Sequence, residues 1–192
     1  WKFPAEQGSS KIISIGWQVG RPGTVTPVAN LEPVSISGAT IKRSTLHNVE
    51  ELERLGIGPG DEVMLERRGD VIPKVIEIIV SANKKIDIPE KCPNCETSLE
   101  RDGPFLKCRN KDCSAQRKLQ IIYWLNTVEI DYLGEKLVEK LFESELITDI
   151  PSIYTLRETQ ISQLERMGEK SAGRIIGNIQ KTKEMHLSRF MA

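Results

Sequence analysis

The sequence predicts a multidomain protein in which a five-stranded β-barrel is followed by a small four-cysteine segment and an all-α domain. Three observations support this order. Residues 6–80 contain stretches rich in Ile, Val and Thr, separated by Gly and Pro, which is typical of short strands. All four cysteines lie within residues 92–113, and residues 119–192 combine helical periodicity with an internal repeat. Residues 81–118 are therefore expected to hold a linker and the cysteine segment.

The composition is that of an ordinary globular chain, with 39% hydrophobic and 28% charged residues among 192. No apolar run approaches the roughly 18 residues of a membrane span, and no charged-then-apolar leader opens the chain. We expect a cytoplasmic protein of a reducing compartment, without a membrane partner. Both ends interrupt recognisable patterns, so we also expect the sequence to be a piece of a longer protein.

The predicted barrel consists of three strands, a helix and two strands. Asn48 is a good helix N-cap with Glu51 three residues later, and Gly56 ends the helix. This order of elements matches the oligonucleotide/oligosaccharide-binding (OB) fold, although any small barrel could share it. The strands are expected at residues 11–19, 24–34, 39–46, 61–66 and 71–80.

The four cysteines form two pairs, one separated by two residues and the other by four. A reducing compartment disfavours disulfides, whereas two thiolate pairs on adjacent turns can complete a tetrahedron around zinc. Four sulfur ligands would close the coordination shell, which predicts a structural Zn²⁺ rather than a catalytic one. Four free or disulfide-bonded cysteines remain the alternative. The predicted ligands are Cys92, Cys95, Cys108 and Cys113.

The helical region contains a repeat, because Asp131–Val138 is echoed thirty-four positions later by Glu165–Ala172. Each copy closes a turn at a glycine and opens a helix with one apolar face, which is the pattern of a helix-hairpin-helix. Amides at the start of the second helix can hold a backbone phosphate without reading a base. A valine at Gly168 is expected both to strain the turn and to block the phosphate. A helical pair that binds no ligand is the alternative.

The charge, the aromatic content and the histidines give only weak evidence about function. The formal net charge is zero, which counts mildly against nucleic-acid binding, and aromatic content of 5% disfavours a single-strand binder. His47 directly precedes the predicted helix cap, so we expect a structural role for it rather than acid–base catalysis.

Taken together, the chain resembles the bacterial NAD-dependent DNA ligases over essentially all of its length. ATP-dependent ligases lack this arrangement of zinc finger and hairpins, so the resemblance points to NAD. The stretches that carry it are Trp1–Ala5, Trp17–Gly23, Ala29–Val34, Thr45–Asn48, Arg68–Pro73, the four cysteines and Met167–Ala172.

The resemblance implies an order of domains and a set of DNA contacts. Residues 1–5 would end a nucleotidyltransferase domain, in which Lys2 lies beside the α-phosphate of the cofactor. On the OB-fold, Arg21 and Arg67 would contact phosphates, while Val71 and Ile72 would press on sugars across the minor groove. The alternative for Val71 and Ile72 is ordinary packing of a strand, without contact to DNA.

The resemblance also implies that both hairpin tips bind phosphate. The sequence departs from the family pattern because Tyr132 and Arg166 replace the first glycine of each hairpin. The matching positions are Gly134, Lys136, Gly168 and Lys170.

An intact enzyme of this kind would use NAD⁺ and Mg²⁺ to seal nicks in double-stranded DNA during replication and repair, acting as a monomer. Its nucleophile motif, Lys-x-Asp-Gly, occurs nowhere in these 192 residues. We therefore expect this chain to be inactive alone and to contribute DNA binding to the intact enzyme. A non-catalytic repair or recombination factor, or a zinc-ribbon protein of an RNA assembly, remains the alternative.

Overall fold

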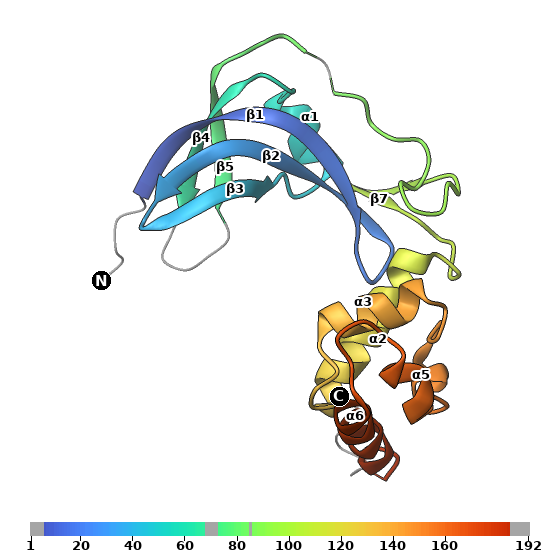
Figure 1. Cartoon of the computed structure of the whole chain (residues 1–192). Helices are drawn as coiled ribbons and strands as arrows, with labels where there is room; N and C mark the ends of the chain where they lie inside the picture. Colours follow the sequence, from blue (N-terminus) through green and yellow to red (C-terminus); the bar gives the residue numbers. More distant parts are fainter. Residues whose placement is uncertain (1–5, 68–72, 85, 185–192) are drawn as a thin grey trace. The chain divides into compact units, whose positions relative to one another are not determined.

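The computed structural model describes residues 6–67, 73–84 and 86–184 (Figure 1). The chain divides into two compact units, Trp1–Asn110 and Lys111–Ala192. Lys2, Val71 and Ile72, which the sequence assigns to binding sites, lie outside the described residues. Among the described helices, none combines the length and apolar character needed to cross a bilayer.

The first unit is built on a closed five-stranded barrel. Strand β1 pairs with both β2 and β4, β4 pairs with β5, and β3 closes the circle by pairing with β2 and, in parallel, with β5. This confirms the predicted order of three strands, a helix and two strands. The elements are β1 (Glu6–Val19), β2 (Thr24–Ile36), β3 (Ala39–Thr45), α1 (Val49–Leu55), β4 (Glu62–Arg67) and β5 (Lys74–Val80).

Helix α1 begins and ends where the sequence predicts. The Asn48 side chain accepts a hydrogen bond from the amide of Glu51 at 2.8 Å. Gly56 adopts a left-handed backbone, with φ 65°, and its amide donates to the carbonyl of Leu52. Leu52 is fully buried and belongs to the barrel core. The other core residues include Ile12, Ala29, Leu31, Ile36, Ile41, Leu46, Ile57, Val63, Leu65 and Val75.

The chain that leaves the barrel is held against it by a buried carboxylate. Asp61 is 1% exposed and accepts hydrogen bonds from the amides of Gly58 at 2.7 Å and Ala82 at 2.6 Å. A Cβ atom on Gly58 would lie 1.9 Å from the carbonyl oxygen of Lys84. Glycine at position 58 is therefore required by the close approach of two backbone segments.

The cysteine segment contains a hairpin that the sequence did not predict. Strands β6 (Glu100–Asp102) and β7 (Phe105–Lys107) pair with each other, and β7 also pairs with β2. The amide of Cys108 donates to the carbonyl of Gly23 at 2.8 Å, and Arg101 forms an ion pair with Glu53 of α1 at 2.7 Å. The cysteine segment is thus an extension of the barrel sheet.

The second unit is helical and contains the two repeats. The first repeat joins α2 (Ser114–Val128) to α3 (Glu135–Glu143), and the second joins α5 (Glu158–Ser162) to α6 (Glu169–Lys181), with the short α4 (Ile150–Ile153) between them. One apolar face of each helix meets in a common core. Its buried residues include Ile121, Leu125, Val128, Val138, Leu141, Ile153, Ile161, Ala172, Ile175 and Ile179.

Candidate metal centre and nucleic-acid interface

The structure brings the four cysteines together. One sulfur from each of Cys92, Cys95, Cys108 and Cys113 lies within 4.8 Å of the others, and none forms a disulfide. Three of the four are nearly inaccessible to solvent, whereas Cys95 is partly exposed. A compact and mostly buried set of four sulfur donors suits a soft, tetrahedral metal ion such as zinc.

Local turns place each sulfur. The amide of Cys92 donates a hydrogen bond to the carbonyl of Thr97 at 2.8 Å, and the amide of Glu96 donates one to the carbonyl of Cys92 at 3.0 Å. The first cysteine pair therefore sits on a closed turn. Cys113 is the N-cap of α2, where the partial positive charge of the helix start favours a thiolate.

The thiols differ strongly in acidity. Hydrogen bonding between Thr97 and the Cys95 sulfur, with a smaller contribution from Asn110, lowers the pKa of Cys95 to about 6. Burial, with smaller contributions from the neighbouring Cys95 and Cys92, raises the pKa of Cys108 to about 12. The Cys95 and Cys108 sulfurs are only 3.5 Å apart. Because buried thiolates this close repel one another, a divalent cation is the group that would let all four ionise together.

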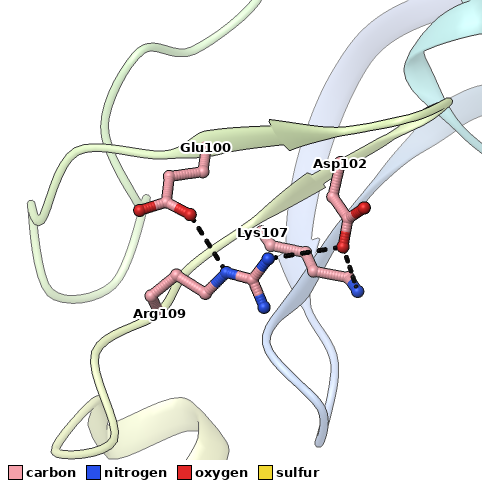
Figure 2. A network of polar contacts seen from close by, with 4 residues as sticks. All are labelled: Glu100, Asp102, Lys107 and Arg109. Atoms are coloured by element: carbon pink, nitrogen blue, oxygen red, sulfur yellow. Dashed lines mark hydrogen bonds and ion pairs between the residues drawn. The ribbon is translucent and has the colours of Figure 1, made fainter.

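Charged side chains brace the hairpin that carries Cys108. Figure 2 shows Glu100 and Asp102 facing Lys107 and Arg109, which flank Cys108 in sequence. Lys107 Nζ lies 2.6 Å from Asp102 Oδ2, and Arg109 contacts Glu100 at 3.1 Å and Asp102 at 3.4 Å. The Lys107 ammonium group lowers the pKa of Asp102. Exposed ion pairs of this kind stabilise weakly.

The two predicted barrel arginines are not brought together. Arg67 ends β4 and pairs across the sheet with Glu6, at the start of β1, whereas Arg21 lies in the turn after the end of β1. Arg67 donates to the carbonyl oxygens of Ile36 and Ser37, both at 3.4 Å. The arginines thus mark opposite ends of one long strand.

The two turns that join the helices of each repeat, residues 129–134 and 163–168, are called the hairpin tips below, and they have similar backbone conformations where they meet α3 and α6. Gly134 and Gly168 cap α3 and α6 in extended conformations, with φ −75° and −102°, and a Cβ atom on either would have no heavy atom within 4 Å. The expectation that a valine at Gly168 would strain the turn is therefore wrong, because any residue adopts this backbone. The left-handed position is two residues earlier, at Tyr132 (φ 66°) and Arg166 (φ 64°).

Each tip leaves helix-start amides open. The amides of Leu137 and Ser171 donate to the carbonyl oxygens of Gly134 and Gly168, at 2.9 and 3.0 Å. The preceding amides, at residues 135–136 and 169–170, have no hydrogen-bond acceptor among the described residues, as expected for the first turn of a helix. Such amides can donate hydrogen bonds to an anionic ligand.

Each hairpin tip is also braced by the helix of the other repeat. Asn178 of α6 donates a hydrogen bond to the carbonyl of Asp131 in the first tip, at 3.3 Å. Lys140 of α3 lies 4.0 Å from the carboxylate of Glu165 in the second tip. The two tips are therefore parts of one packed unit rather than independent loops.

His47 has a positive φ of 62° and an exposed side chain, between the end of β3 and the cap of α1. Sequence reasoning missed Thr97 and Asn110, which hydrogen-bond near the Cys95 sulfur. Their position two residues from Cys95 and Cys108 was the signal that could have indicated this role.

Comparison with known proteins shows that the chain is similar to DNA ligases. Residues 9–86 match the family model of the NAD-dependent DNA ligase OB-fold domain. Over its whole length, the chain is 40% identical to a DNA ligase of Methylacidiphilum infernorum, 42% identical to one of Solibacter usitatus and 45% identical to one of Helicobacter hepaticus. These alignments cover 29%, 30% and 30% of the three relatives, so the chain spans about three tenths of their length.

Proposed function

Because the chain is a segment of a bacterial NAD-dependent DNA ligase, we propose that it supplies the part of such an enzyme that grips nicked duplex DNA. The observation that carries this proposal is the continuous similarity to DNA ligases over all 192 residues, with an OB-fold domain of the NAD-dependent type at residues 9–86. OB-folds bind nucleic acids through one face of the barrel.

The proposal divides the chain by task. Residues 1–5 end the nucleotidyltransferase domain, residues 6–80 form the OB-fold domain, residues 81–118 form a linker and a four-cysteine zinc finger, and residues 119–192 belong to a helix-hairpin-helix domain. The close cluster of four cysteines supports Zn²⁺ as the ion of the finger. The open helix-start amides support the hairpin assignment.

DNA would be held although the formal net charge of the chain is zero. Amides at the two tips would bind phosphates, with help from Lys136 and Lys170, which are both exposed. Arg21 and Arg67 would contact the backbone from the barrel. Phosphate contacts of this kind position a duplex without reading its sequence, which suits an enzyme that must act at any nick.

In the intact enzyme, a lysine outside this chain would attack NAD⁺, pass AMP to the 5′-phosphate at the nick, and let the 3′-hydroxyl displace it. Mg²⁺ would offset charge on the phosphates. Lys2 would add a fixed cation beside the α-phosphate.

Binding to DNA tests this function. The purified chain is expected to bind nicked or intact duplex more tightly than single strands of the same sequence, with little base preference and with affinity that falls as salt rises. Fluorescence anisotropy with labelled oligonucleotides measures all three properties. Equal affinity for single strands and duplex would contradict the proposal.

The chain alone is expected to be catalytically silent. It lacks the Lys-x-Asp-Gly motif, so incubation with NAD⁺ and Mg²⁺ should add no adenylyl group. Intact-protein mass spectrometry checks this result. A covalent AMP adduct on any lysine would show that the assignment of tasks is wrong.

A further inference from the structure

The four cysteine sulfurs differ in their access to solvent. Cys92, Cys108 and Cys113 are 1%, 2% and 0% exposed. Cys95, by contrast, is partly exposed. Small reagents dissolved in water therefore reach the Cys95 sulfur before the other three. Because a metal-bound cysteine is a thiolate, and the thiolate is the form that attacks oxidants, Cys95 combines accessibility with reactivity.

Hydrogen bonds hold Cys95 in this exposed place. The backbone bonds from Glu96 to Cys92 and from Cys92 to Thr97, at 3.0 and 2.8 Å, close the turn that carries Cys95. The Thr97 hydroxyl lies 3.4 Å from the Cys95 sulfur, and the Asn110 side chain donates a hydrogen bond to that hydroxyl at 3.3 Å. The exposure of Cys95 is therefore a property of a hydrogen-bonded turn rather than of a loose loop.

A second sulfur lies within reach of the first. Cys108 Sγ is 3.5 Å from Cys95 Sγ, and both residues belong to the first compact unit. A disulfide has a sulfur–sulfur bond of about 2.05 Å, so the two atoms need to approach each other by only about 1.5 Å. Because Cys108 is almost fully buried, a dissolved oxidant reaches it less readily than it reaches Cys95. The two sulfurs are thus suited to different steps of one oxidation.

We propose that Cys95 is a site of reversible oxidation by hydroperoxides, with Cys108 as the residue that converts the oxidised sulfur into a disulfide. The Cys95 thiolate attacks one peroxide oxygen, the oxygen–oxygen bond breaks, and the second oxygen leaves as hydroxide or alkoxide, so that Cys95 becomes a sulfenic acid. The Cys108 thiolate then attacks the Cys95 sulfur and displaces the hydroxyl group, which takes up a proton and leaves as water. The sulfurs together lose two electrons, which the peroxide accepts.

This oxidation would remove two of the four sulfur ligands. A disulfide sulfur carries no negative charge and is a weak metal ligand, so only Cys92 and Cys113 would remain to hold the ion. We therefore expect the oxidised chain to release zinc, and a dithiol reductant to restore both thiolates. The inference rests on the zinc finger of the proposed function, but it does not require the chain to bind DNA.

Peroxide treatment of the zinc-loaded, 192-residue chain tests this inference. Hydrogen peroxide is added in the presence of a chromogenic zinc chelator, and samples are alkylated, digested and searched for disulfides by mass spectrometry. We expect release of about one zinc per chain, in step with a disulfide between Cys95 and Cys108. Dithiothreitol with added zinc should return the chain to its zinc-loaded form.

Three serine variants separate the two roles, because each of them loses one metal ligand. Under peroxide, Cys92→Ser should still form the Cys95–Cys108 disulfide. Cys95→Ser and Cys108→Ser should form any disulfide within the chain at least about tenfold more slowly. Cys108→Ser should also accumulate sulfenic acid at Cys95, which dimedone traps as an adduct detectable by mass spectrometry. Cys92→Ser is therefore the matched control for loss of metal.

The outcomes distinguish this inference from the zinc finger on which it rests. A parent chain that carries no zinc would contradict both. A zinc-loaded parent that keeps its metal and its thiols, at peroxide concentrations that oxidise a free cysteine peptide, would overturn the inference and leave the zinc finger standing. A first disulfide that joins another pair of cysteines, or two chains, would overturn it as well.

Discussion

Cys108→Ser is expected to release the bound metal and to loosen residues 91–118. The Cys108 sulfur is buried and lies 3.5 Å from that of Cys95. A serine hydroxyl does not ionise to replace the thiolate, so one of four ligands is lost. Structural zinc sites of this type contribute on the order of 10 kcal/mol to local folding, which a short segment with few core residues cannot otherwise supply.

Two measurements check this result. Elemental analysis should find about one zinc per chain in the parent purified without chelator, and much less in the variant. Hydrogen exchange should show faster exchange at residues 91–118. Ser98→Ala, in the same loop and without a sulfur ligand, is the control and should retain the metal. Parent protein that contains no zinc would refute the prediction.

Gly168→Val is expected to weaken DNA binding tenfold or more while leaving the fold intact. The extended backbone at Gly168 and the open space around it allow a valine without strain. The branched side chain would instead occupy the place where a phosphate approaches the amides of residues 169–170. Losing charge-assisted hydrogen bonds costs about 1.5–3 kcal/mol each. Gly168→Val should therefore weaken binding more than Lys170→Ala, which should only reduce the slope of log K against log salt by about one unit.

Gly177 offers a matched control on the same helix. It is exposed, and a Cβ atom there meets nothing within 4 Å. Gly177→Val should therefore bind nicked duplex as the parent does. Circular dichroism should confirm that both variants are folded. If folded Gly168→Val binds as tightly as the parent, the second repeat serves only in packing.

Strong local patterns predicted most of the barrel. Asn48, Glu51 and Gly56 specify a short helix through side-chain capping and a left-handed stop, and these contacts form as expected. The four-cysteine cluster was predictable because the spacing of the residues limits where the sulfurs can lie. Both features depend on residues that are close in sequence.

Features that depend on tertiary pairing were missed. Strand β6 has three exposed polar residues and no alternation, so only the turn dipeptide Asp102-Gly103 indicated a hairpin. Strand β1 begins at Glu6 rather than Lys11, because its polar start pairs with β4. The left-handed conformation of Tyr132 was likewise missed, because propensity favours glycine in that region.

The pairing of β7 with β2 has a consequence for the behaviour of the chain in solution. Strand β3 pairs with β2 only from Val28 onward, and β7 covers the remaining edge at Thr24 and Val25. An uncovered strand edge is a template for pairing with another molecule. The cysteine hairpin therefore covers this edge, and a chain whose hairpin detached would expose it for pairing with another molecule and become prone to aggregate.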